Sequence, residues 1–109
     1  MRTSLRLRYL RGVFEKFIHY IQSKGSTVVI FLPSYHPTSY DLLMKNSKYM
    51  IIKDVEIYLN NFASFSVEIF GSYNPHKYNF TNIDFIDGMH SFDYVIEEVF
   101  KEYKKQLSI

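Results

Sequence analysis

Residues 27–32, Thr-Val-Val-Ile-Phe-Leu, are the stretch on which the fold of this chain depends. The run is apolar after its first residue, rich in β-branched side chains, and bounded by Gly25 and Pro33. A short run of this kind is typical of a strand that is buried on both faces in the middle of a parallel sheet. We therefore expect a strand here, followed by a loop over residues 33–37 at its carboxyl end.

Helices and a second strand are expected around this stretch. Apolar spacing of three and four residues predicts a helix over about residues 4–24, a second helical region between Ser39, its expected cap, and residue 60 or 61, and a last helix capped by Ser91. Residues 65–70 alternate apolar and polar side chains, which is typical of a strand with one solvated face or at a sheet edge. The apolar faces are Leu10, Val13, Phe14, Phe17, Ile18 and Ile21 in the first helix and Phe92, Val95, Ile96, Val99, Phe100 and Tyr103 in the last.

The order helix, strand, helix, strand, helix predicts an α/β fold with parallel strands flanked by helices, because a strand–helix–strand unit makes a right-handed parallel crossover. Two parallel strands alone make a poor domain, since a sheet buried on both faces needs more strands. We expect residues 1–109 to form a single but incomplete domain. A second polypeptide or a homo-oligomer would then complete the sheet, unless the chain is the C-terminal part of a larger domain.

Composition narrows the classes of function. With 47% apolar residues the chain is not a disordered tail, and a net charge of +2 is too small to favour nucleic acid as a partner. The absence of cysteine excludes disulfides and thiolate metal sites. The sequence shows neither a secretory signal peptide nor a segment of about 20 apolar residues that could span a membrane, so we expect no membrane partner and, by default, a cytoplasmic location.

Residues 74–90 hold the side chains most suited to chemistry, with Asp84, Asp87 and His90 close together before the last helix. A loop that follows a strand is where α/β proteins place their sites. In Asp-Gly-Met-His, residues 87–90, a carboxylate can accept the Nδ1 hydrogen of the imidazole and leave Nε2 to act as a general base. Either Asp84 or Asp87 can be the partner of His90.

Further residues of the two loops are candidates to line this site: Tyr35, His36 and Asn74. Ser34 follows the first strand, but its Pro-Ser-Tyr setting lacks the small residues of a nucleophile turn, so the sequence does not identify a nucleophile.

The histidines also allow a metal site as an alternative. His36, His76 and His90 with Asp84 or Asp87 would offer ligands that suit zinc. Their spacing is not that of a metal motif, and we predict neither a metal nor another cofactor.

The apolar strand, the Pro-x-x-His-Pro loop of residues 33–37, the edge-like strand, and the Asp-x-x-His segment before a closing helix together resemble the C-terminal part of the SGNH/GDSL hydrolase superfamily. The resemblance implies a three-layer, doubly wound sheet of the flavodoxin-like type. It implies Asp87 as the acid and His90 as the base of a Ser-His-Asp triad. The Gly-Asp-Ser segment that carries the nucleophile in that family is absent from this sequence, as are the glycine and asparagine of its oxyanion hole.

The function implied by this resemblance is that of the acid–base segment of a serine esterase or acyltransferase acting on an acylated carbohydrate or lipid. Without a nucleophile we expect the chain to be inactive alone. The alternative is a non-catalytic, self-associating interaction module derived from the same fold, because unpaired strands invite association.

Overall fold

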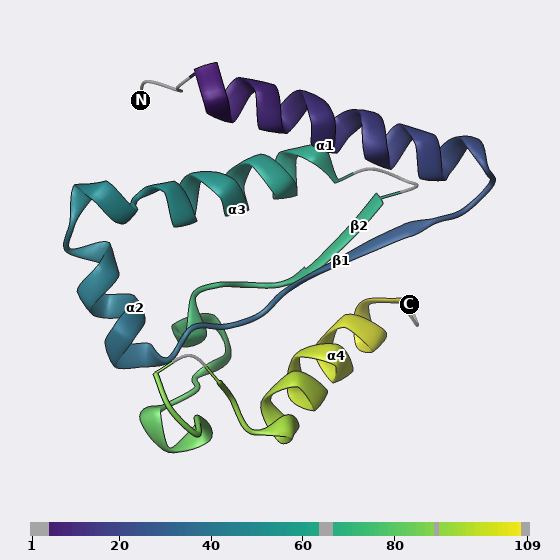
Figure 1. Ribbon diagram of the computed structural model, residues 1–109. Helices are drawn as coiled ribbons and strands as arrows, with labels where there is room; N and C mark the ends of the chain where they lie inside the picture. Colours follow the sequence, from purple (N-terminus) through teal and green to yellow (C-terminus); the bar gives the residue numbers. More distant parts are fainter. Residues whose placement is uncertain (1–4, 64–66, 89, 108–109) are drawn as a thin grey trace.

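The chain alternates helices and strands in the order expected from its sequence. A computed structural model describes residues 5–63, 67–88 and 90–107. The result is a small α/β fold with two parallel strands flanked by helices (Figure 1). The elements are α1 (Leu5–Ser23), β1 (Val28–Leu32), α2 (Pro37–Met44), η1 (Ser47–Tyr49), α3 (Ile51–Phe62), β2 (Val67–Gly71), η2 (Pro75–Tyr78), η3 (Asn82–Asp84) and α4 (Asp93–Leu107), where η marks a 3-10 helix.

The sheet consists of β1 and β2, which pair in parallel from Val28 opposite Val67 to Leu32 opposite Gly71. The predicted parallel pairing is confirmed. Helices α1 and α3 lie on one side of the strands and α4 on the other (Figure 1). Gly71 has a φ of +89°, and a Cβ at this position would lie 2.3 Å from the carbonyl oxygen of Leu32. The close approach of the two strands at their carboxyl ends therefore requires glycine.

The burial of the strand faces differs from the prediction, although β2 lies at an edge of the described sheet, which is one of the two alternatives expected for it. Val29 in β1 is 50% exposed, so β1 is not buried on both faces, whereas no residue of β2 is exposed. The reason is that β1 has one neighbouring strand, while α4 covers β2: the Phe70 ring stacks on Tyr103 at 4.5 Å, and the Tyr103 hydroxyl donates to Glu68. Glu68 is thus half-buried rather than on a solvated face. Residues 65 and 66 of the predicted strand lie outside the described residues.

The core lies mainly between the sheet and α4. Phe80, Phe85, Val95 and Val99 form its buried cluster, and Phe31, Phe70 and Tyr78 pack against it. Full burial of one such apolar side chain stabilises the fold by about 1.5–3 kcal/mol. The loop that follows β2 therefore contributes to the core and is held in place by it.

On the other side of the sheet, α1 packs on α3. The Phe14 ring lies 5.6 Å from that of Phe62 and 6.4 Å from that of Tyr58, and Tyr58 donates a hydrogen bond to Glu15. Ile18 is fully buried.

Both outer helices leave part of their apolar faces uncovered. In α1, Leu10, Val13 and Phe17 are about half exposed, although they belong to the predicted apolar stripe. In α4, Val95 and Val99 are buried, but Ile96 and Phe100, together with Phe92 just before the helix, lie at four-residue spacing and remain more than 40% exposed. Apolar periodicity marks these faces, but no element of the described chain covers them.

Two helix starts differ from the prediction. α2 begins at Pro37 and its cap is His36, whose Nδ1 accepts from the Ser39 amide at 3.4 Å, so Ser39 is not the cap. The fixed φ of proline suits the first helical position. α4 begins at Asp93, and Ser91 instead forms an isolated antiparallel bridge with Phe85. Among the described helices, none is long and apolar enough to span a membrane.

Candidate functional site

The loops at the carboxyl ends of the two strands continue the pairing of the sheet. The Ser34 hydroxyl donates to the Ser72 carbonyl oxygen at 2.9 Å, and the Tyr35 amide donates to the Tyr73 carbonyl oxygen at 3.0 Å. Ser34 is buried, and its hydroxyl hydrogen is used in the bond to Ser72. This arrangement gives Ser34 a structural role and does not favour it as a nucleophile.

Glu56 of α3 anchors the second of these loops. Its Oε2 accepts from the Ser72 hydroxyl at 2.7 Å and its Oε1 from the Tyr73 amide at 2.9 Å. The Ser72 oxygen in turn accepts from the Asn74 amide at 3.1 Å. Burial is the largest cause that raises the pKa of Tyr73, and the charges of the neighbouring Tyr35 and Glu56 raise it further. The phenol of Tyr73 therefore stays protonated.

The Asp87–His90 turn has the geometry that its spacing suggests. His90 Nδ1 lies 2.9 Å from Asp87 Oδ1 and 3.0 Å from Oδ2, and the His90 amide donates to Oδ1 at 2.9 Å. The Ile86 amide donates to the His90 carbonyl oxygen at 2.7 Å and closes the turn. Both side chains are more than half exposed. With Nδ1 held by the carboxylate, Nε2 is left as the ring nitrogen that a reacting group could meet.

Asp84 has other partners. Its Oδ2 accepts from the Thr81 amide at 2.8 Å and its Oδ1 from the Tyr94 hydroxyl at 2.6 Å. The bond from Tyr94, then that from Thr81, lowers the pKa of Asp84 below its ordinary value. Asp84 thus fixes η3 to α4, and of the two carboxylates that the sequence left open, Asp87 is the one that contacts His90.

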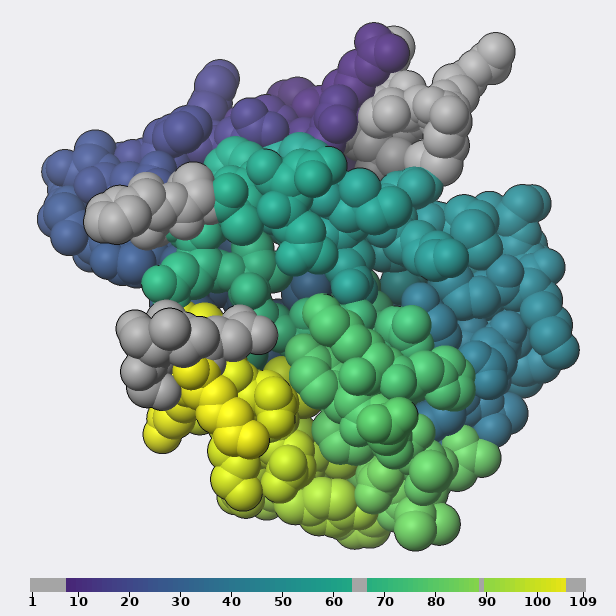
Figure 2. Space-filling model, turned by 180° about the vertical axis from the view of Figure 1, so that it is seen from behind, coloured from purple at the N-terminus to yellow at the C-terminus, as the bar shows by residue number. Residues whose placement is uncertain are grey.

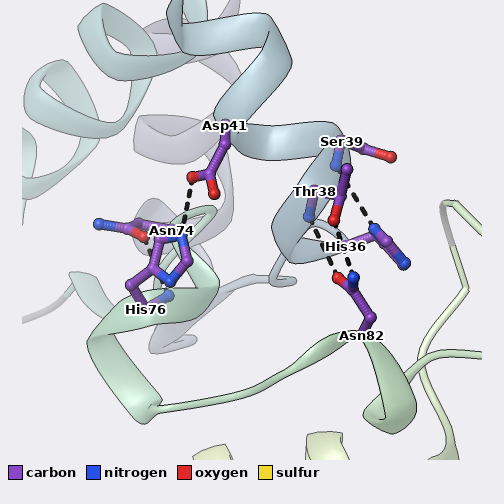
Figure 3. Close-up of polar contacts among 7 residues, drawn as sticks. All are labelled: His36, Thr38, Ser39, Asp41, Asn74, His76 and Asn82. Atoms are coloured by element: carbon purple, nitrogen blue, oxygen red, sulfur yellow. Dashed lines mark hydrogen bonds and ion pairs between the residues drawn. The ribbon is translucent and has the colours of Figure 1, made fainter.

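The start of α2 lies beside the Asp87–His90 turn. A Cβ at Gly88 would lie 3.4 Å from the Ser39 hydroxyl oxygen, and the His36 ring meets the edge of Phe85 at 5.5 Å. Figure 3 shows Thr38 and Asn82 joined on this side of α2. The Asn82 side chain accepts from the Thr38 amide at 3.2 Å and donates to its hydroxyl at 2.8 Å.

A second imidazole–carboxylate pair, His76 with Asp41, was not identified from the sequence. His76 Nε2 lies 2.7 Å from Asp41 Oδ1, and Asn74 Oδ1 accepts from the His76 amide at 3.0 Å (Figure 3). Asn74, expected to line the site of His90, belongs to this group instead. Tyr35, also expected there, packs edge-on against the rings of Tyr40 and Tyr73.

Two cavities open near β2, and neither has Asp87 or His90 in its wall. One of about 530 Å³ runs along the free edge of β2, between η2 and α4. The other, of about 470 Å³, lies between α2, α3 and η2. Figure 2 shows the segment after β2, in green, between the teal of α3 and the yellow of α4. The predicted acid–base pair therefore stands on an open surface.

Metal ligands do not gather in the described part of the chain. No group of three His, Asp or Glu residues there could hold an ion. His36, His76 and His90 have separate partners, Ser39, Asp41 and Asp87, so the zinc alternative gains no support.

No protein-family model, curated protein or solved structure matches this chain. The resemblance to SGNH hydrolases therefore stays a prediction drawn from the sequence.

Proposed function

We propose that this chain supplies the acid and base of an SGNH-type serine esterase or acyltransferase that acts on an acylated carbohydrate or lipid. The observation that supports it is the contact of His90 Nδ1 with both oxygens of Asp87. In this proposal His90 Nε2 takes the proton of a serine hydroxyl as the serine oxygen attacks the acyl carbonyl carbon. The imidazolium, stabilised by Asp87, then gives that proton to the departing alcohol and leaves the acyl group on the serine.

The position of the pair is consistent with this proposal. The turn follows β2 on the carboxyl side of two parallel strands, the side on which open α/β sheets bind their ligands. The proposed complete fold is a three-layer, doubly wound, flavodoxin-like domain, to which α1 and α3, the sheet, and α4 would contribute part of each layer.

The serine nucleophile and the oxyanion donors are proposed to come from outside these 109 residues. Within the described part of the chain, Asp87 is the hydrogen-bond partner of the His90 ring, and the Ser34 hydroxyl is bound to Ser72. An exposed pair without a cavity also needs a facing surface before it can hold a substrate. We therefore propose that a second polypeptide or an adjoining segment completes the site, and that the isolated chain is inactive.

The test begins with the DNA upstream of the codon for Met1. We expect a coding segment, in frame or as a neighbouring gene, in which a strand is followed by Gly-Asp-Ser. Produced together with this chain, that segment should be labelled at its serine by a fluorophosphonate probe. The isolated chain should not be labelled.

Variants of the pair make the test specific. His90→Gln should slow labelling of the complete protein by at least about 10³-fold, and Asp87→Asn should slow it as well. His19→Gln on α1 is the matched control and should leave the rate unchanged. Labelling of a serine in the isolated chain, or full labelling of the His90→Gln complex, would overturn the proposal.

Self-association without catalysis is the second candidate function, and the open edge of the sheet favours it. Among the described residues, β1 has no strand paired to its second edge, and each layer leaves apolar side chains exposed: Val29 in the sheet, Phe17 in α1 and Ile96 in α4. Unpaired strands and apolar patches promote association between chains. This candidate predicts a stable dimer or larger oligomer in sedimentation.

A pair of substitutions separates edge-mediated association from nonspecific adhesion. Val29→Lys should shift the oligomer to monomer, whereas Ile83→Lys, at a more exposed position on η3, should not. A monomer at all concentrations in the unsubstituted chain would exclude this candidate.

A further inference from the structure

The cavity between α2, α3 and η2 has the features of a binding site that the proposed hydrolase function does not use. It lies at the carboxyl end of β2, where Ser72 directly follows the strand. Its volume of about 470 Å³ is that of a small-molecule site. His76, half exposed, forms one wall, and Asp41 holds its Nε2 from the neighbouring α2 (Figure 3).

Two lysines contribute to the lining of this cavity. Lys53 projects from α3 and Lys77 from η2. In the described part of the chain neither ammonium forms an ion pair, and the Lys77 ammonium lies 5.9 Å from the ring of Tyr78. Two ammonium groups from different elements therefore border one cavity, and neither belongs to an ion pair of the described residues.

Glu56 is the acidic residue that the described part of the chain contributes to the lining, and both of its oxygens already accept hydrogen bonds. Its oxygens accept from the Ser72 hydroxyl and the Tyr73 amide, which stabilise its charge from within the protein. With two lysines against one carboxylate, the lining has a formal charge of +1.

Hydrogen-bonding groups accompany these charges. Asn74 uses its side-chain oxygen for the His76 amide, which leaves its NH₂ group as a donor. Burial, then the charges of Glu56 and Asp41, raises the pKa of Tyr40, so its hydroxyl stays protonated and can also donate. The lining thus combines cations with donors, the combination that recognises an oxyanion.

We propose that this cavity binds the phosphate or carboxylate group of a small molecule between Lys53 and Lys77, with Asn74 and Tyr40 as further donors. The proposal is independent of the acid–base role of Asp87 and His90, because neither residue lines the cavity. Lysine acts on such a group as a point charge from each side.

Titration of the full chain with inorganic phosphate and, separately, with acetate tests the proposal, with amide shifts followed by NMR at constant ionic strength. Saturable shifts are expected at Ser72, Asn74, His76 and Lys77 with at least one of the two anions, and the tighter anion identifies the group that is bound. Lys53→Gln and Lys77→Gln should each weaken binding about tenfold, which corresponds to about 1.4 kcal/mol.

Matched variants decide the outcome. Lys16→Gln removes an exposed lysine of α1 with the same change of net charge, and His90→Gln removes the proposed catalytic base; both should bind the anion as the unsubstituted chain does. Lys53 and Lys77 are exposed, so their variants should keep the dispersed spectrum of the folded chain. No saturable shift with either anion, or equal weakening by Lys16→Gln and Lys53→Gln, would overturn the proposal.

Discussion

The ring of His90 meets both oxygens of the Asp87 carboxylate, with Nδ1 at 2.9 Å from Oδ1 and 3.0 Å from Oδ2. This contact places the proton of the neutral ring on Nδ1 and leaves Nε2 as an acceptor, the tautomer that a general base requires. Asp87→Asn introduces an amide that can donate to Nδ1, so we expect the proton to move to Nε2 in a large share of the molecules.

The ring ¹⁵N chemical shifts of His90, measured at alkaline pH, distinguish the two tautomers. Asp84→Asn is the matched control, because Asp84 bonds to Thr81 and Tyr94, and it should leave the ring unchanged. Identical ring shifts in the unsubstituted chain and in Asp87→Asn would contradict the orienting role of Asp87.

Gly71 should be the least replaceable glycine among those described. With φ at +89° and the Leu32 oxygen 2.3 Å from the position of a Cβ, Gly71→Ala should lower the free energy of unfolding by at least about 2 kcal/mol. Gly12→Ala is the opposite case, because nothing lies within 4 Å of the added Cβ and alanine favours a helix interior. It should raise stability by about 0.5–1 kcal/mol. Urea unfolding of both variants checks the contrast, and equal effects would contradict the close strand approach.

Element order was predictable because periodicity and turn residues are local properties of the chain. The apolar run before Pro33, the alternation before Gly71 and the helical spacing on either side predict the observed α/β order and the parallel pairing. The degree of burial was not predictable, because it depends on neighbours. The apolar run around Val29 is typical of a central strand. In the described sheet, however, this strand pairs with one other strand, and Val29 is half exposed.

The contacts of the candidate site were likewise predictable where they are local and not predictable where they join distant segments. Asp87 and His90 lie three positions apart in one turn, so the sequence alone indicated their contact. Asp41 and His76 are 35 positions apart, and Glu56 and Ser72 are 16 apart. Those contacts arise only when α2 and α3 pack beside the loop after β2, and nothing in the local sequence distinguishes Glu56 from a solvated helical carboxylate.

Glu56→Gln should destabilise the loop after β2. The amide can still accept from the Tyr73 amide, but its NH₂ group cannot accept from the Ser72 hydroxyl, and the charge that strengthens both bonds is lost. A cost of about 1.5–3 kcal/mol is expected, measured by urea unfolding, together with faster hydrogen exchange at the Tyr73 amide. Glu97→Gln, an exposed carboxylate of α4, is the control and should change stability by less than about 0.5 kcal/mol. If the two variants matched, Glu56 would not be the anchor of this loop.

Tyr94→Phe should change how stability depends on acid pH. The Tyr94 hydroxyl is the largest cause of the lowered pKa of Asp84, whose ordinary value is 3.8. A lowered carboxyl pKa contributes stability that is present above the ordinary value and is lost as pH falls through the lowered one. Tyr94→Phe should therefore raise the pKa of Asp84 toward its ordinary value. The variant should then lose less of its free energy of unfolding as the solution becomes acidic.

Two measurements follow that change. By urea unfolding, the free energy of unfolding at pH 7 should be larger for the unsubstituted chain than for Tyr94→Phe, and the difference should shrink as the pH falls below 3.8 toward about 2. A ¹³C titration of the Asp84 carboxyl gives the pKa itself. Tyr9→Phe, a strongly exposed tyrosine of α1, is the control and should show no difference that depends on pH. A constant difference between Tyr94→Phe and the unsubstituted chain from pH 7 to pH 2 would mean that Tyr94 stabilises α4 by packing alone, because loss of packing does not depend on the protonation of Asp84.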